Sequence, residues 1–316
     1  MRNSALEFPQ KGSAALVDEC PARGVGPHEV LFETRYTGVT NGTERHAMMA
    51  EHHWGKFPSR HGYQQVGTVI EVGSEVNGFA PGDWVFRGDY VGHRGWNMVD
   101  LSRPNLLVKL PASEDYRQYA LLGVAGVAMK AVRRLGVRPA DRVLVVGCGP
   151  IGFFSAVSAL MHGAEVVVSD FNDRRLGIAA QQGCDRVLNA GDPDYWQRLE
   201  ELREFKYIID ASGYDNLFFD VFEHRLLARD GAICPMAVRT EVRFPWSMLH
   251  MTDGRIEVSC HFGLDDLRVV LRGIRKGAIK PDAIVTHFVS IEDAPKIYGI
   301  LRDNPAELFG VVFDWA

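Results

Sequence analysis

Six residues near the middle of the chain have the spacing of a phosphate-binding turn. Gly147-Cys148-Gly149-Pro150-Ile151-Gly152 directly follows the apolar run Val143-Leu144-Val145-Val146 and opens a segment of helical spacing. In such a turn the first glycine permits the bend, the second lets the backbone approach a pyrophosphate, and the third allows close packing of helix on strand. Backbone N–H groups at the start of the helix then face the phosphates. The pattern predicts a dinucleotide site at Gly147, Gly149, Pro150, Ile151 and Gly152.

An acidic residue at the end of the next apolar run indicates which dinucleotide is bound. Val166-Val167-Val168-Ser169 ends at Asp170, near the spacing at which a carboxylate accepts hydrogen bonds from the adenosine ribose. Because a carboxylate repels a 2′-phosphate, we expect NAD(H) rather than NADP(H). Arg175 and its neighbour Arg174 are placed to stack on adenine or, in the alternative case, to pair with a phosphate.

The elements that position these residues alternate between β-type and helical runs. Strands are predicted at 142–146, 165–170, 207–210, 232–234 and 256–260, and helices at 151–161, 174–182, 216–227 and 265–276. Such alternation builds a parallel sheet covered by helices. Between residues 5 and 110, short β-type runs such as 29–36, 67–72 and 83–86 are separated by closely spaced glycines, which predicts a β-rich domain with tight turns.

The length of 316 residues is sufficient for two domains. We predict a first domain at 1–115, completed by 286–316, and a second at 116–285 that starts with a helix at 118–135. A capping box at Ser290 predicts a helix to about residue 304, and the last strand, 308–313, needs a partner in the first domain.

Composition limits the classes of partner and compartment. The formal net charge is -5 and no run of Lys or Arg is present, which argues against nucleic acid and anionic lipid and favours a small molecule. The first residues lack the apolar stretch of a signal peptide or membrane span. The five cysteines, at 20, 148, 184, 234 and 260, form no CxxC pair, so we expect reduced thiols in a cytoplasmic protein.

Several short motifs, taken in order, resemble the medium-chain dehydrogenase/reductase superfamily. The markers are 29–33 leading into 37–39, Asn41-Gly42-Thr43-Glu44-Arg45-His46, Gly62-Tyr63-Gln64-Gln65-Val66-Gly67, Pro81-Gly82-Asp83-Trp84-Val85 and Asp210-Ala211-Ser212-Gly213. The resemblance implies an α/β protein: a GroES-like β-rich catalytic domain plus a Rossmann domain with a doubly wound parallel sheet. It also implies a substrate cleft between them, hydride transfer at an alcohol carbon, cofactor contact at Ser212, and a homodimer through the edge of the Rossmann sheet.

The ligands of the catalytic zinc in that family have no counterpart here. The family's Cys is replaced by Asn41 and its His by Tyr63, while the acid beside that His is replaced by Gln64. The third ligand would fall within 121–127, where no side chain can hold zinc. The lobe of four cysteines is absent from 87–100. We therefore predict a zinc-independent member with no metal site.

Without zinc, hydrogen-bond donors must stabilise the developing alkoxide. Tyr63 and Asn41 stand at the lost ligand positions, and Tyr63 is the first choice for the acid. To act as a base near neutrality its pKa must fall, so we expect a cationic neighbour or the charge of the nicotinamide nearby. Thr43 and His46 match the family's proton relay, and Glu44 is expected to orient Thr43 or Asn41, or to act as a base.

Narrower features resemble the bacteriochlorophyllide dehydrogenase type: GTE at 42–44, GYxxVG at 62–67, Thr286-His287 and Asp314-Trp315. They do not fix a tetrapyrrole substrate. The leading function is a dehydrogenase or ketoreductase acting on a secondary alcohol or ketone. The alternatives are an NADPH-dependent quinone or enoyl reductase and a catalytically silent nucleotide-binding protein. A metal cluster of Glu51, His52, His53 and His61 is less favoured than a solvated loop.

Overall fold

The computed structural model describes residues 3–19, 23–52 and 55–316. The chain divides into two compact units, the first comprising 1–123 and 284–316 and the second 124–283. Cys20 and His53 lie outside the described residues. No helix in the described ranges combines the length and apolar character needed to cross a membrane.

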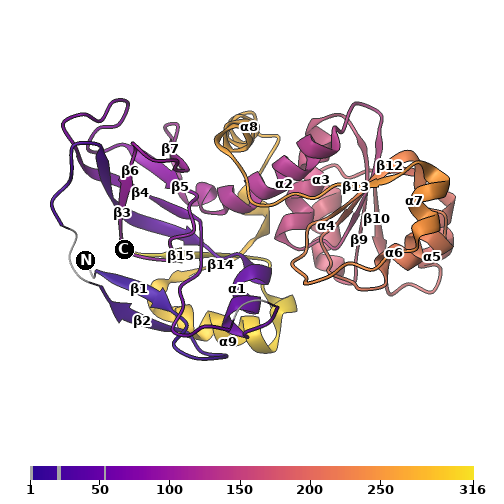
Figure 1. Cartoon of the computed structure of the whole chain (residues 1–316), viewed down its shortest axis with the longest axis horizontal. Helices are drawn as coiled ribbons and strands as arrows, with labels where there is room; N and C mark the ends of the chain where they lie inside the picture. The colour runs from indigo at the N-terminus through magenta and orange to yellow at the C-terminus, as the bar shows by residue number, and fades with distance from the viewer. Residues whose placement is uncertain (1–2, 20–22, 53–54) are drawn as a thin grey trace. The chain divides into compact units, whose positions relative to one another are not determined.

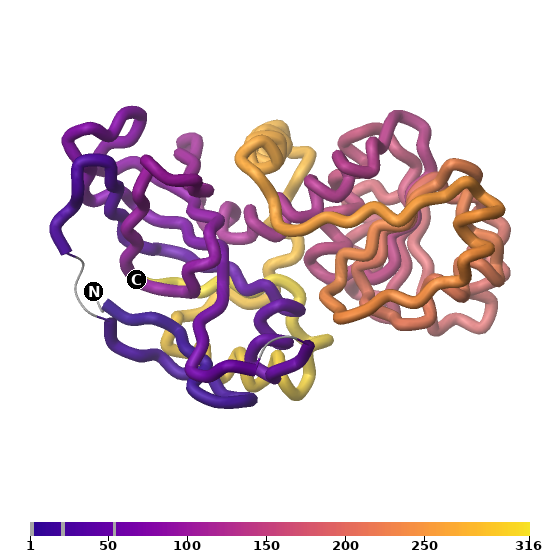
Figure 2. Tube along the Cα trace, in the orientation of Figure 1, coloured from indigo at the N-terminus to yellow at the C-terminus, as the bar shows by residue number. Residues whose placement is uncertain are grey.

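Seven strands form the sheet of the first unit (Figure 1). The order is β14-β15-β3-β4-β5-β7, and β6 also pairs with β3. The strands are β3 (Glu29–Gly38), β4 (Gln65–Val72), β5 (Trp84–Arg87), β6 (Trp96–Asp100), β7 (Leu107–Lys109), β14 (Val285–Ser290) and β15 (Gly310–Asp314). The predicted last strand pairs antiparallel with β3, Phe313 lying opposite Thr37, so its expected partner is confirmed. In Figure 2 the yellow end of the chain accordingly runs beside indigo strands.

Two α-helices and a hairpin also belong to the first unit. They are α1 (Asn41–Met48), α9 (Ala294–Asp303), and β1 (Ser4–Glu7) paired with β2 (Ala15–Asp18). Their shared core includes Phe8, Met48, Tyr298 and Phe313. The sequence pattern did not predict α1, because eight residues with a mixed apolar pattern give little periodicity. This missed helix carries most of the candidate catalytic residues.

The predicted helix at 118–135 is divided in two. A 3-10 helix, η1 (Arg117–Leu121), comes first and α2 (Leu122–Leu135) follows. Because η1 packs against β3, β4 and β15, residues 116–123 belong to the first unit by their contacts.

The second unit contains the predicted parallel sheet, in the order β10-β9-β8-β11-β12-β13. Its strands are β8 (Arg142–Val146), β9 (Glu165–Asp170), β10 (Arg186–Asn189), β11 (Phe205–Asp210), β12 (Leu227–Pro235) and β13 (Arg255–Ile256). Its helices besides α2 are α3 (Pro150–Met161), α4 (Asp173–Gln181), α5 (Tyr195–Glu201), α6 (Leu217–Glu223), α7 (Trp246–Thr252) and α8 (Leu264–Arg275). The strand order reverses beside β8, which is where ligands bind in doubly wound sheets. The α/β fold class is therefore confirmed.

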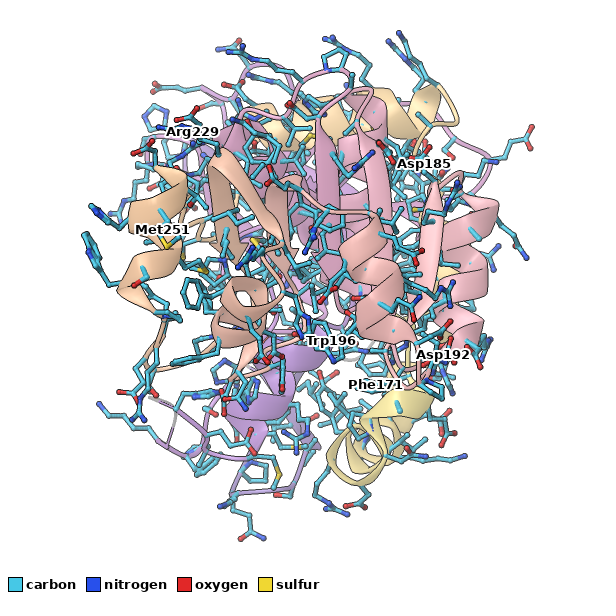
Figure 3. All side chains as sticks on the ribbon, turned by 90° about the vertical axis from the view of Figure 1, so that its right-hand side faces the viewer. Phe171, Asp185, Asp192, Trp196, Arg229 and Met251 are labelled. Carbon is cyan, nitrogen blue, oxygen red and sulfur yellow. The ribbon has the colours of Figure 1, made fainter. Side chains whose placement is uncertain are left out.

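Differences from the predicted elements concern short segments. The pattern missed β10, α5 and α7, and it extended the helix at 216–227 beyond the end of α6 at Glu223 to the first residue of β12, Leu227. Each missed element has only a few residues, too few for a clear period. Figure 3 shows the two ends of the parallel strands. Phe171 and Asp192, which follow β9 and β10, lie at one end of the sheet, and Asp185, which precedes β10, lies at the other.

Candidate functional site

Two glycines of the predicted phosphate turn are required by the fold of the second unit itself. Gly147 has φ +90°, and a Cβ there would lie 2.8 Å from the Ser212 backbone. A Cβ on Gly152 would lie 1.8 Å from the Gly147 carbonyl oxygen. Any larger residue at either position collides with backbone, so these glycines let α3 start directly against the strand ends.

Gly149 differs from both. Its φ of -69° and ψ of -178° suit any residue, and a Cβ there would meet no atom within 4 Å. The fold therefore does not require glycine at this position, and the open space is a cradle that a side chain would fill. Pro150 has no N–H, and the N–H groups of Ile151 and Gly152 have no acceptor within the helix. A pyrophosphate fits this helix start.

Asp170 joins the turn to the end of β9. Its Oδ2 accepts a hydrogen bond from Cys148 N at 2.6 Å, and its Oδ1 accepts one from Asn172 N at 2.8 Å. A carboxylate oxygen accepts about two hydrogen bonds, so both oxygens retain capacity for ribose hydroxyls. Asn172 caps α4 by accepting from Arg175 N at 3.2 Å, which fixes the start of the helix that carries the two arginines.

Ser212 lies in a loop held by buried Asp210. The Oδ1 of Asp210 accepts from Ser212 N at 3.0 Å and from Ser212 Oγ at 2.8 Å, while Oδ2 forms an ion pair with Arg239. The Ser212 hydroxyl thus shapes the loop that packs against Gly147. The cofactor contact expected at Ser212 remains a prediction.

Tyr63 is buried, with 3% of its surface exposed. Its ring meets the edge of Tyr90 at a centroid distance of 5.1 Å. Burial raises the pKa of Tyr63, and the nearby Tyr90 and Glu44 raise it further. None of the neighbours that shift this pKa is a cation, and the expected influence of a cation or of the nicotinamide charge remains a prediction. At neutral pH the side chain is therefore a neutral phenol.

Asn41 does not act as predicted. Its Nδ2 faces the backbone carbonyls of Leu308 at 3.3 Å and Phe309 at 3.0 Å, and because carbonyls only accept hydrogen bonds, the orientation of the amide is fixed. Its buried Oδ1 has no partner among the described residues. The amide therefore offers an acceptor, and the expected donor to an alkoxide is not supported at this position.

Thr43 and His46 share one face of α1, since they are three residues apart. His46 Nδ1 contacts the Glu51 carboxylate, to which Arg45 also binds, and the His46 ring meets that of His52 at 4.6 Å. The His46 side chain is one-quarter exposed, as a relay to solvent requires. Their relay role remains a prediction. Across the described ranges, no three His, Cys, Asp or Glu residues are grouped to hold a metal ion.

Glu44 is the hub of a buried network that the sequence pattern did not predict. Its Oε1 accepts from Thr40 N at 2.7 Å; its Oε2 accepts from His93 Nε2 at 3.0 Å and from the Tyr298 hydroxyl. The Glu44 carboxylate, 1% exposed, accepts from these three groups, so the structure gives no support to the suggested role as a base, which remains a prediction. It orients Thr40, rather than the predicted Thr43 or Asn41.

The network continues to the end of the chain. His93 Nδ1 lies 2.7 Å from Thr37 Oγ1, which also accepts from Trp315 Nε1 at 3.0 Å. If Nε2 of His93 carries the proton, Trp315 donates to Thr37, Thr37 to His93, and His93 to Glu44, so every group is satisfied. The terminal Asp-Trp marker thus has a structural role. The signals in the sequence that pointed to members of this network were the family motifs that contain Glu44 and Trp315.

A catalytic zinc does not fit the first unit. Asn41 turns its amide toward backbone, Tyr63 is a neutral phenol, and 121–127 lie in η1 and α2 without a ligand side chain. The four described cysteines, at 148, 184, 234 and 260, are free thiols. No chemical step is assigned to a metal.

Two protein-family descriptions match the chain. Residues 26–107 match the alcohol dehydrogenase GroES-like domain, and residues 150–275 match the zinc-binding dehydrogenase domain. A sorbitol dehydrogenase from Halalkalibacterium halodurans is 25% identical, over 92% of this chain and 93% of that protein. An L-threonine 3-dehydrogenase from Anaeromyxobacter sp. is 26% identical, over 94% of each.

Solved structures with the same fold include proteins that hold either nicotinamide dinucleotide. One from Escherichia coli CFT073, described as a short-chain alcohol dehydrogenase with NADH, has a TM-score of 0.86 and 17% identity over 99% of both chains. One from Sinorhizobium meliloti 1021, described as a zinc-binding dehydrogenase with NADP, has a TM-score of 0.83 and 18% identity over 99% of both chains.

The narrower resemblance to the bacteriochlorophyllide dehydrogenase type remains a prediction. The two domain types occur in the predicted order, and the relatives extend along nearly the whole sequence. From the two domain matches and the full-length relatives together, the chain belongs to the medium-chain dehydrogenase/reductase superfamily.

Proposed function

We propose that the protein is a zinc-independent, NAD(H)-dependent dehydrogenase or ketoreductase that interconverts a secondary alcohol and a ketone of a small molecule. The observation that carries this proposal is Tyr63, a buried phenol at the position of a lost metal ligand, with a raised pKa. The nicotinamide, when bound, supplies or accepts the hydride. Tyr63 donates a proton to the carbonyl oxygen during reduction and receives it during oxidation. Thr43 and His46 exchange protons with solvent.

The preference for NAD(H) rests on Asp170. Its carboxylate is fixed by Cys148 N and Asn172 N and retains lone pairs for two vicinal hydroxyls. A 2′-phosphate at the same place meets a negative charge. Because proteins of this fold bind either nucleotide, a comparison of NADH and NADPH separates this proposal from the quinone or enoyl reductase alternative.

The relatives suggest the class of substrate. Sorbitol and L-threonine, which name two of them, each carry a secondary alcohol beside another polar group. We propose a substrate of this class, in which the carbinol is flanked by a hydroxyl, amine or carboxylate. A homodimer through the edge strand β13 and a cytoplasmic location belong to the same proposal.

The test is a screen for NAD⁺ reduction over a panel of polyols, hydroxy acids and simple secondary alcohols, with and without a chelator. Turnover that survives the chelator is expected, and Tyr63→Phe should lower kcat by about 100-fold while NADH still binds. Sensitivity to the chelator would overturn zinc independence. NADH binding without turnover of any alcohol or ketone would favour a silent nucleotide-binding protein.

A further inference from the structure

We propose that Arg239 is a cofactor-binding residue whose guanidinium donates hydrogen bonds to the nicotinamide half of the dinucleotide. Arg239 lies in the loop between β12 and α7, and neither the sequence motifs nor the family resemblance assigns it a role. The assignment rests on the proposed binding of NAD(H) but not on the role of Tyr63. Every residue involved belongs to the second unit.

The ends of β11 and β12 are joined at Asp210. Asp210 lies opposite Pro235 in the two parallel strands, and its backbone carbonyl oxygen accepts from Met236 N at 2.8 Å. One oxygen of its buried carboxylate holds the Ser212 loop, and the other accepts from Nη2 of Arg239. The guanidinium of Arg239 therefore lies at the carboxyl end of the parallel strands, beside the loop that packs against the phosphate turn.

The place of Arg239 along the sheet indicates which half of the cofactor lies near it. In a doubly wound sheet, each half of the strands binds one mononucleotide at its carboxyl end. Asp170 ends β9 on one side of β8 and is the expected contact of the adenosine ribose. Asp210 ends β11 and Arg239 follows β12, both on the other side of β8. Since the turn after β8 is expected to hold the pyrophosphate, Arg239 lies on the nicotinamide side.

The protein itself uses only part of the Arg239 side chain. A guanidinium carries five N–H groups in a rigid fork and accepts no hydrogen bond. Among the described residues, Asp210 accepts from Nη2, and the buried Nε has no hydrogen-bond partner. Because buried donors in native proteins are nearly always paired, the guanidinium requires an acceptor that the described residues do not supply. The side chain is 12% exposed, so a ligand at the strand ends can approach it.

The charge of the ion pair indicates what kind of acceptor fits. Asp210 is fully buried and offsets the positive charge of Arg239. The pair therefore presents hydrogen-bond donors with little net charge, which suits a neutral oxygen better than a phosphate. The nicotinamide half of NAD(H) carries two such groups, the ribose hydroxyls and the carboxamide oxygen.

The experiment measures binding without turnover, by calorimetric titration with ADP, ADP-ribose and NADH. ADP keeps both phosphates, ADP-ribose adds the second ribose, and NADH adds the nicotinamide. Arg239→Lys keeps a cation beside Asp210 but loses the planar fork of donors. It should raise the Kd of NADH by about 10-fold and leave the Kd of ADP unchanged. A rise shared by ADP-ribose supports an acceptor on the ribose, and a rise for NADH alone supports the carboxamide.

Two further variants separate hydrogen bonding to the cofactor from a purely structural ion pair. Arg239→Met leaves the Asp210 carboxylate buried without a cation, so its temperature of thermal unfolding should fall, whereas Arg239→Lys should unfold like the unaltered protein. Arg243→Met is the matched control, because Arg243 lies in the same loop, pairs with Glu241 and is 78% exposed. It should leave all three Kd values unchanged.

The failure of this role and the failure of the proposed function give different results. If both Arg239 variants bind NADH like the unaltered protein, or weaken ADP as much as NADH, Arg239 does not contact the nicotinamide half. The proposed binding of NAD(H) would then stand. If the unaltered protein binds neither ADP nor NADH, that proposed binding is wrong and the role of Arg239 falls with it.

Discussion

The dinucleotide turn and the Tyr63 region are built in opposite ways. Gly147 to Gly152 is one continuous segment whose shape depends on contacts with the strands and loop beside it. Around Tyr63, by contrast, the hydrogen bonds join residues that are far apart in the sequence, such as Glu44 and Tyr298. A local motif can hold a cofactor because phosphate recognition needs backbone N–H groups in a row. Directing a single proton needs side chains from several segments.

The largest effect should come from exchanging glycines within the turn. Gly152→Ala places a Cβ 1.8 Å from the Gly147 carbonyl oxygen and should lower the free energy of unfolding by about 4 kcal/mol. Gly149→Ala, the matched control, meets no atom within 4 Å and should unfold like the unaltered protein but bind NADH more weakly. Urea unfolding and a fluorescence titration with NADH measure the two quantities. Equal stability losses would contradict the division between fold-required and ligand-required glycines.

Glu44→Gln tests the buried network next. The substitution puts an amide nitrogen among the donors Thr40 N, His93 and Tyr298, so we expect a loss of about 3 kcal/mol in unfolding free energy. Glu51→Gln is the matched control: the Glu51 side chain is 37% exposed and pairs with Arg45 and His46, so this substitution should cost less than about 1 kcal/mol. A loss for Glu44→Gln no larger than that for Glu51→Gln would show that the network does not hold α1.

The dependence of stability on alkaline pH should also trace to this network. Burial and the charge of Glu44 raise the pKa of Tyr298 well above its usual value near 10. The fold therefore favours the phenol, and its contribution is complete below about pH 10 and is lost as the pH rises from there toward the folded-state pKa. Tyr298→Phe should flatten that decline in urea unfolding between pH 9 and about 11. An unchanged slope would exclude Tyr298 as its source.

Asp170→Asn should change the selectivity of the nucleotide site more than the fold. The amide no longer repels a 2′-phosphate, so the ratio of the Kd values for NADPH and NADH should fall by about 10-fold. The asparagine oxygen can still accept from Cys148 N, which makes this variant milder than alanine. A constant ratio would show that Asp170 does not select the nucleotide.

The smallest effect is expected at the far end of the network. Trp315→Phe removes one hydrogen bond, from Nε1 to Thr37, and should cost about 1 kcal/mol in unfolding free energy with little change in kcat. Thermal unfolding and steady-state kinetics distinguish this from a catalytic role. A loss of kcat as large as that of Tyr63→Phe would show that Trp315 takes part in the reaction.

The two regions also differ in how far the sequence could predict them. The strands β8 and β9 were predicted with their observed bounds, because a short apolar run that is rich in valine and bounded by turn residues is typical of a buried strand. The same reasoning identified Asp170. It missed α1, whose eight residues give no clear period, and it did not anticipate the partners of Asn41 and Glu44. Their roles depend on which partners face them, the carbonyl of Phe309 in one case and His93 in the other.

The sequence alone determined the parallel sheet and the glycine turn, since each depends on residue type at fixed local spacing, whereas the loss of the zinc ligands is what the family resemblance implies. Only the tertiary structure decided which groups meet at Glu44. Its carboxylate accepts from His93 and Tyr298, which lie far from it in the sequence, and spacing along a chain does not specify such partners. For that reason the glycine turn of the second unit can be predicted from the sequence, while the hydrogen bonds around Glu44 in the first unit depend on tertiary packing.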